Sequence, residues 1–137
     1  MLRPRLNSNR GRQRDGISTV EFAVTLPLLT LLVFGSIETA HSIQLKQGLT
    51  VTAYEAVMVA TSQSANEDQT NLRALEIASA FQINNLKIET VPKITPDLPA
   101  GTTVTVTVSA PTNSNRIGPN FFFLNRVISV QASMVRL

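Results

Sequence analysis

Apolar and polar residues divide the chain into one long apolar segment followed by shorter amphipathic and alternating segments. The long apolar segment contains an uncharged run of sixteen residues, from Phe22 to Ile37, directly after Glu21. At about 1.5 Å per residue, this run covers roughly 24 Å of a hydrocarbon core that is about 30 Å thick. Uncharged residues on both sides extend it, so a membrane-spanning helix is predicted from about Ile17 to Leu45.

No cluster of turn residues interrupts the pattern between Ile17 and about Ser64, which predicts one long helix. Its second half is amphipathic, because apolar residues recur at helical spacing at Leu45, Leu49, Ala53, Ala56 and Ala60. A row of small residues four apart, Thr52, Ala56, Ala60 and Ser64, has two interpretations. Either another helix approaches it closely, or an alanine-rich helix packs on its own domain.

Pro27 lacks an N–H group and predicts a kink near residues 23–27.

After a polar turn at residues 63–69, the pattern predicts a second helix from Thr70 to Ile83 and then three strands. The helix has a broad apolar face of Leu72, Leu75, Ile77, Ala78 and Phe81. Residues 102–109 alternate strictly between valine and hydroxyl side chains, and residues 86–91 and 126–136 have weaker strand patterns.

The predicted fold class is therefore α+β: a long N-terminal membrane-spanning helix continues into a small head with a second helix. The head also contains a roughly three-stranded, mostly antiparallel sheet. We expect the valine face of this sheet to pack against the small-residue side of the long helix and against Leu72, Leu75 and Phe81.

Positive charge is concentrated before the apolar helix. Residues 1–15 hold five arginines and one aspartate, a net charge of +4, while the rest of the chain carries −1. This basic, polar leader has little to bury, so we expect it to be disordered, with structure beginning near Gly16. The charge pattern predicts a cytoplasmic N-terminus and an exported head. Nucleic-acid binding is disfavoured, because no aromatic residues interleave the arginines and no basic patch follows.

Residue counts argue against catalytic chemistry. The chain has no cysteine, and His41 is its single histidine, so thiolate metal sites, cysteine nucleophiles and histidine-based triads are excluded. Glu67 and Asp68 are adjacent acids in the predicted polar turn, where a solvated surface is the simpler interpretation. No glycine-rich loop that cradles phosphate is present. We therefore predict no enzyme activity, no metal and no cofactor.

One motif carries a more specific hypothesis: Gly16 is followed after four residues by Glu21 and then by the apolar run. This pattern resembles the processing site of type IV pilin-like proteins, in which a prepilin peptidase cuts after the glycine, here between Gly16 and Ile17. The segment from Asp15 to Ala60 is similar more narrowly to TadE-like minor pilins (pseudopilins) of the tight adherence, or Flp, pilus. Glu21-Phe22 and the later Pro27 are the specific part of that resemblance.

The resemblance implies a pilin-like fold and a non-enzymatic role in assembling or priming pili for adhesion and biofilm formation. It also implies that Glu21 sets the register of packed subunits by pairing with the N-terminal amine of a neighbour. Phe22 belongs to the same assembly segment, and Pro27 lets the helix bend. The implied partners are prepilin peptidase, the major and minor pilins, the inner-membrane assembly platform and the membrane itself.

These expectations divide the chain into a basic cytoplasmic leader, residues 1–16, a membrane and assembly helix, residues 17–45, and an exported head, residues 46–137. Two alternatives remain open. One is an unprocessed, single-pass assembly or binding factor that faces the periplasm, and the other is a secreted protein with an ordinary signal peptide. The aromatic run Phe121, Phe122, Phe123 and Leu124 is either buried beside the sheet or a docking patch for another subunit.

Overall fold

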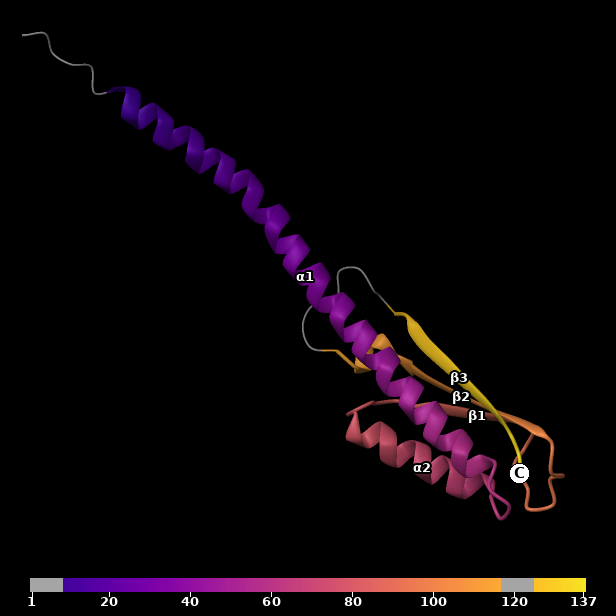
Figure 1. The fold of residues 1–137 in the computed structure, drawn as a ribbon. Coiled ribbons are helices and arrows are strands. Elements are labelled where there is room, and N and C mark those ends of the chain that lie inside the picture. Colours follow the sequence, from indigo (N-terminus) through magenta and orange to yellow (C-terminus); the bar gives the residue numbers. More distant parts are fainter. Residues whose placement is uncertain (1–8, 117–124) are drawn as a thin grey trace, which may run out of the picture. The chain divides into compact units, whose positions relative to one another are not determined.

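The computed structural model describes residues 9–116 and 125–137, and it divides the chain into two units, residues 1–36 and 37–137. The aromatic run at residues 121–124 lies outside the described part. The fold is the predicted α+β arrangement (Figure 1): a long apolar helix, a second helix and a three-stranded antiparallel sheet, arranged as in a pilin.

The long helix, α1, extends from Asn9 to Ala60. The expectation that structure begins near Gly16 is therefore wrong, since the helix already includes residues 9–15. Arg10, Gln13 and Arg14 favour helix, and each residue added to an existing helix gains a backbone hydrogen bond without a new nucleation step. At the other end, Thr61 and Ser62 donate backbone hydrogen bonds to Val57 and Val59 and close the last turn earlier than predicted.

The second helix, α2, extends from Glu67 to Ala80, so it begins three residues before the predicted start. Asn66 caps it, because its side-chain oxygen accepts a hydrogen bond from the backbone N–H of Gln69 at 2.8 Å. Glu67 and Asp68 occupy the first turn, where negative charge complements the helix dipole. The last three residues of the predicted turn, residues 67–69, are thus the start of the helix, while residues 63–66 form the turn.

The three strands are β1 (Lys87–Val91), β2 (Thr103–Pro111) and β3 (Val127–Val135), and β2 lies in the centre of the sheet. Both pairings are antiparallel, with Val91 opposite Thr105 and Thr103 opposite Val135. A short 3-10 helix, η1 (Thr112–Ser114), follows β2. Strict alternation in β2 places its valines on one face, as predicted.

The core of the head lies between the valine face of β2 and one side of α1. Val104, Val106 and Val108 are completely buried, together with small α1 residues that include Ala53, Ala56 and Ala60. Thr52 is buried as well. The small-residue row of α1, up to Ala60, therefore packs on the sheet of its own domain, which supports the second of its two interpretations.

The predicted contact face of α2 is wrong for its large residues, although Ala78 of that face is buried. Leu72, Leu75 and Phe81 are 67%, 51% and 46% exposed, whereas α2 buries Thr70, Ala74 and Ala78. These buried residues recur every fourth position and form one stripe, which includes Ala78 of the predicted face, whereas Leu72 lies on the far side of the helix. Small side chains let the α2 backbone lie closer to the core than leucines would, so size of the contact residues, not their hydrophobicity, orients this helix.

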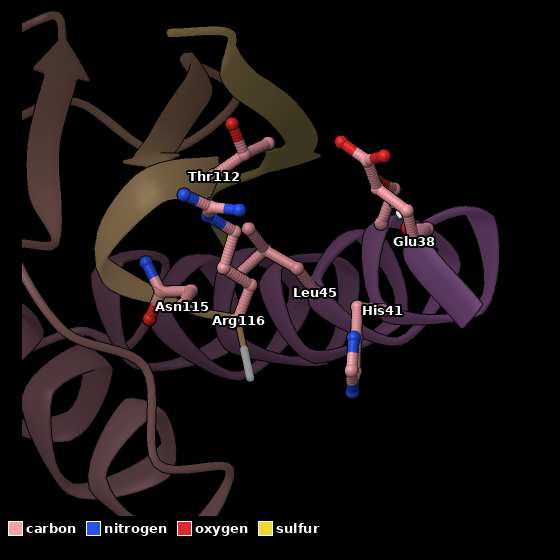
Figure 2. A pocket seen from close by; sticks show the side chains of 7 residues that line it. Glu38, His41, Leu45, Thr112, Asn115 and Arg116 are labelled. Atoms are coloured by element: carbon pink, nitrogen blue, oxygen red, sulfur yellow. Dashed lines mark hydrogen bonds between the residues drawn. The ribbon is translucent and has the colours of Figure 1, made fainter. Parts of the chain in front are cut away.

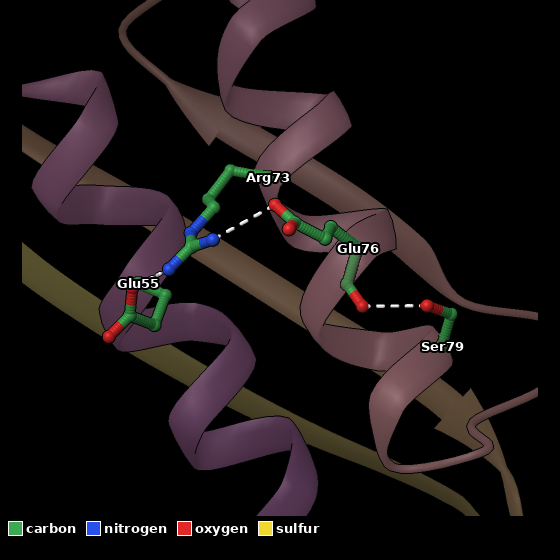
Figure 3. A network of polar contacts seen from close by, with 4 residues as sticks. All are labelled: Glu55, Arg73, Glu76 and Ser79. Carbon is green, nitrogen blue, oxygen red and sulfur yellow. Dashed lines mark hydrogen bonds and ion pairs between the residues drawn. The ribbon is translucent and has the colours of Figure 1, made fainter.

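An ion-pair network connects α2 to α1 on the solvent side (Figure 3). The Arg73 guanidinium donates to Glu55 of α1 at 2.8 Å and to Glu76 of α2 at 2.9 Å. Hydrogen bonds to Glu55 and then Glu76 raise the pKa of Arg73 above its ordinary value. Because Arg73 and Glu55 are partly exposed, this network fixes the alignment of the two helices more than it stabilises the fold.

Candidate processing and assembly segment

The five residues singled out from the sequence all lie in the first unit of the chain, on α1. Gly16, Ile17 and Glu21 occupy little more than one helical turn, Phe22 follows directly, and Pro27 lies inside the helix further along. Every described side chain from Ile17 to Val33 is exposed in the single chain, including Phe22 at 62%. The candidate residues are thus accessible to a protease or to neighbouring subunits.

Gly16 has no packing reason to be glycine. A Cβ atom built at this position would meet no heavy atom within 4 Å. Its backbone is helical, so the left-handed conformation that only glycine tolerates is not needed either. Within a helix, glycine is about 1 kcal/mol less favourable than alanine. The residue therefore weakens the helix at this point and gains no contact there.

Ile17 and Glu21 are four positions apart and share one face of α1, separated by about 6 Å along the axis. The Thr25 hydroxyl donates a hydrogen bond to the Glu21 backbone carbonyl. No ion pair to the Glu21 carboxylate is formed by any described residue. A carboxylate at the edge of an apolar segment is costly unless a partner neutralises it, so this position is suited to contact with another chain.

Pro27 is contained in α1 without a break in the helix assignment. Because proline has no N–H, the Ala23 carbonyl loses its usual partner four residues on. The Thr30 hydroxyl donates to the Leu26 carbonyl at 2.8 Å, a side-chain bond within the same helix. The kink near residues 23–27 stays a prediction.

Among the described residues, α1 is the one helix that is long and apolar enough to cross a membrane. Its most apolar window of 18 residues has a mean hydropathy of 2.0, and none of that window is buried. Helices buried in a protein core can pass the same length and composition test, but this one is exposed along the window. The segment is therefore consistent with a single membrane anchor.

A second feature, which the sequence did not reveal, lies at the start of the head. Glu38 is only 7% exposed, although it follows the apolar run directly. It lines a small cavity of about 10 Å³ with His41, Ser42, Leu45, Thr112, Asn115 and Arg116. In Figure 2 the Glu38 carboxyl group and the Arg116 guanidinium point to the side of α1 on which Thr112 of η1 lies, whereas the His41 ring points to the other side.

This cavity offers room for about one water molecule and no space for a substrate. Its lining includes the buried Glu38 carboxylate and the Arg116 side chain. No group of three or more potential metal ligands from histidine, cysteine, aspartate or glutamate exists in the part of the chain that the structure describes. The one sequence signal for this feature was an acidic residue within an otherwise apolar helical stretch.

Comparison with known proteins finds a family match that covers most of α1. Residues 16–58 match the family model described as TadE-like protein. The matched segment begins at Gly16 and includes Glu21, Phe22 and Pro27, so it covers every candidate residue. Neither the curated proteins nor the solved structures contain a match to this chain.

Proposed function

We propose that this chain, whose residues 16–58 match the TadE-like family model, takes part in Tad pilus assembly as a minor pilin or pseudopilin. In this proposal prepilin peptidase cuts between Gly16 and Ile17, and the mature chain takes part in assembling or priming tight adherence pili. Adhesion to surfaces and biofilm formation are consequences of the pili.

The observation that carries this proposal is the isolated glycine at position 16. It lies in an exposed helix, touches nothing, and weakens the helix where a protease needs extended backbone. A bulkier residue would cost nothing in packing, so the glycine serves recognition or local unwinding. Glu21 follows at the spacing that the processing motif requires.

Cleavage at this site also explains the place of Glu21. Removing residues 1–16 turns Ile17 into a helix N-terminus, with a new α-amino group and three backbone N–H groups that lack helical partners. Glu21 lies in the first turn or so of this new helix, where the dipole favours negative charge. We propose that the Glu21 carboxylate of one subunit pairs with the Ile17 amine of its neighbour, next to Phe22, and fixes the axial register.

The charge distribution supports the proposed topology: a cytoplasmic leader, residues 1–16, and a head on the periplasmic or extracellular side, with a single span in the inner membrane. Within the membrane and assembly helix, residues 17–45, large apolar residues are exposed from Ile17 to Ile37 and again at Ile43. Glu38 and Leu45 are buried in the head. We therefore assign the hydrocarbon to residues 17–37, which span about 30 Å.

The proposed partners follow from this sequence of steps. Prepilin peptidase acts on the leader, the inner-membrane platform receives the trimmed chain, and the major and other minor pilins pack against α1. Pro27 lets α1 adjust its direction between bilayer and filament. The proposal assigns the chain no catalytic residue and no cofactor.

Intact-mass measurement tests the proposal most directly. The full chain is expressed in cells with an active prepilin peptidase, and membrane and sheared-pilus fractions are analysed separately. We expect a mature chain that begins at Ile17, and a mass that retains Met1 would identify the alternative, an unprocessed single-pass assembly factor. A matched culture that lacks the peptidase should yield the precursor with residues 1–16 attached.

A further inference from the structure

The two edges of the sheet in the head differ in their protection against additional strands. The edge strand β1 has five residues, carries the Lys87–Glu89 ion pair at 2.8 Å, and is followed directly by Pro92. The edge strand β3 has nine residues and contains neither a charged residue nor a proline. Short length, charge and proline are the devices that keep edges from pairing, and β3 has none of them.

The backbone of β3 is oriented to accept a further strand. The Arg136 N–H donates to the Thr102 carbonyl at 2.9 Å, and the Arg126 carbonyl accepts from the Thr112 N–H at 2.8 Å. The backbone N–H and C=O groups of the even-numbered residues thus point toward β2. In an antiparallel pair the direction alternates, so the odd-numbered residues direct theirs to the open side. These are Val127, Ser129, Gln131, Ser133 and Val135.

The side chains of β3 define what such a strand should carry. Ile128, Val130, Ala132 and Met134 pack against the core but remain partly exposed, whereas the valines of β2 are fully buried. The apolar layer is therefore incomplete beside β3. On the other face, Val127 and Val135 are 65% and 50% exposed and flank uncharged polar side chains. An added strand with apolar residues at alternate positions would complete the inner layer.

We propose that the β3 edge binds an extended, uncharged segment of a different protein chain, which adds a fourth strand to the sheet. Backbone hydrogen bonds would supply most of the affinity, and the alternate apolar side chains would select the partner. At this edge the unpaired backbone groups require an extended partner, whereas an exposed helix surface does not require one backbone conformation.

A second copy of the chain is the main competing occupant. The strand sequence is nearly symmetric about Gln131, with serine at 129 and 133 and valine at 127 and 135, so two copies of β3 fit each other in antiparallel register. However, β3 runs in the same direction as residues 37–60 of α1 (Figure 1). Antiparallel pairing would make the two α1 helices antiparallel as well. Copies anchored in one membrane cannot do this, and that exclusion rests on the proposed membrane anchoring.

The same symmetry supplies a probe that is free of this restriction. A fluorescein-labelled peptide of residues 127–135 is titrated with the full chain in detergent micelles, and binding is followed by fluorescence anisotropy. We expect saturable binding. Gln131→Pro removes an N–H that points to the open side and leaves the β2 hydrogen bonds in place, so it should weaken peptide binding about tenfold or more. The matched control Gln131→Thr keeps the N–H and should bind like the unmodified chain.

Amide hydrogen exchange of the unmodified chain makes the test independent of whether Gln131→Pro folds. The odd-numbered amides of β3 should exchange quickly in the free chain and become protected when the peptide binds, while the even-numbered amides stay protected in both states. Peptide binding that fails, or that leaves the odd-numbered amides unprotected, would overturn the proposal. Self-association of the full chain that Gln131→Pro abolishes would instead assign the edge to a second copy. None of these readouts depends on cleavage after Gly16.

Discussion

The guanidinium of Arg136 donates a hydrogen bond to the backbone carbonyl of Gln63 at 2.8 Å and so ties the end of the last strand to the turn between the two helices. The same group donates to the Thr95 carbonyl at 3.0 Å and the Pro96 carbonyl at 3.2 Å. Arg136 is only 3% exposed. One buried side chain therefore connects three segments that are distant in sequence.

Arg136→Ala should destabilise the head strongly, because three carbonyls lose their donor and a cavity replaces a long side chain. We expect the free energy of unfolding to fall by about 2–4 kcal/mol. Arg136→Lys should cost less, since an ammonium group can still reach one or two of the carbonyls. Urea unfolding of the full chain in detergent measures both. The control is Lys93→Ala at an exposed position, and equal effects of Arg136→Ala and Lys93→Ala would contradict the role of Arg136.

Gly48 of α1 should not tolerate a larger side chain. Its Cβ position would lie 3.0 Å from the Ile83 side chain and 3.3 Å from Phe81, so the lack of a side chain lets the residues after α2 approach α1. Gly48→Val should therefore reduce the free energy of unfolding by about 1–3 kcal/mol through overpacking. The matched change Gly16→Val, at a position with no neighbours, should leave the thermal midpoint of the head unchanged. Similar losses for the two variants would contradict this packing.

The orientation of α2 can be tested by exchanging large and small residues. Ala74 is completely buried and Leu72 is 67% exposed. Ala74→Leu should therefore lower the free energy of unfolding by about 1–3 kcal/mol, whereas Leu72→Ser should change it by less than about 0.5 kcal/mol. If Leu72→Ser proved the more damaging variant, the face of α2 predicted from the sequence would be right after all.

The elements with a strong periodic signal could be predicted from the sequence, and the contacts that depend on side-chain size could not. The apolar run predicts α1, and strict valine–threonine alternation predicts β2, because one residue pattern fits one backbone geometry. The contact residues of α2 were only partly right, since the broad apolar face includes the buried Ala78 but also leucines that the packed core leaves exposed. The buried Glu38 lines a cavity with Thr112 and Arg116, which follow β2, and no local pattern connects these residues.

For the candidate processing site, the sequence supplied the residues and the structure added little. Gly16, Glu21 and Pro27 were identified from a short sequence motif and its resemblance to a pilin family, which requires no knowledge of tertiary contacts. The structure adds that Gly16 has no neighbours, which separates a packing role from a recognition role. It does not bring Glu21 to a partner within the described chain, as expected for a residue proposed to act between subunits.

Gly16→Ala tests whether the glycine matters for recognition or only for helix stability. The variant should accumulate as the untrimmed precursor, visible by intact mass as the retained residues 1–16. Gly11→Ala is the matched control, because it adds a similar helix preference, about 1 kcal/mol, within the leader but away from the cut. Normal trimming of Gly16→Ala would refute the assigned site, and a block by both variants would attribute cleavage to unwinding of the helix.

Glu21→Gln tests the proposed register contact with the smallest change in shape. It removes the charge that is proposed to pair with the Ile17 amine of a neighbouring subunit, while the span from residue 17 to 37 keeps its apolar character. We expect normal insertion and normal trimming, with pilus output in the sheared fraction reduced several-fold. The matched control Thr25→Val changes a polar side chain one turn further on and should assemble normally. Unchanged pilus output from Glu21→Gln would show that its carboxylate does not set the register.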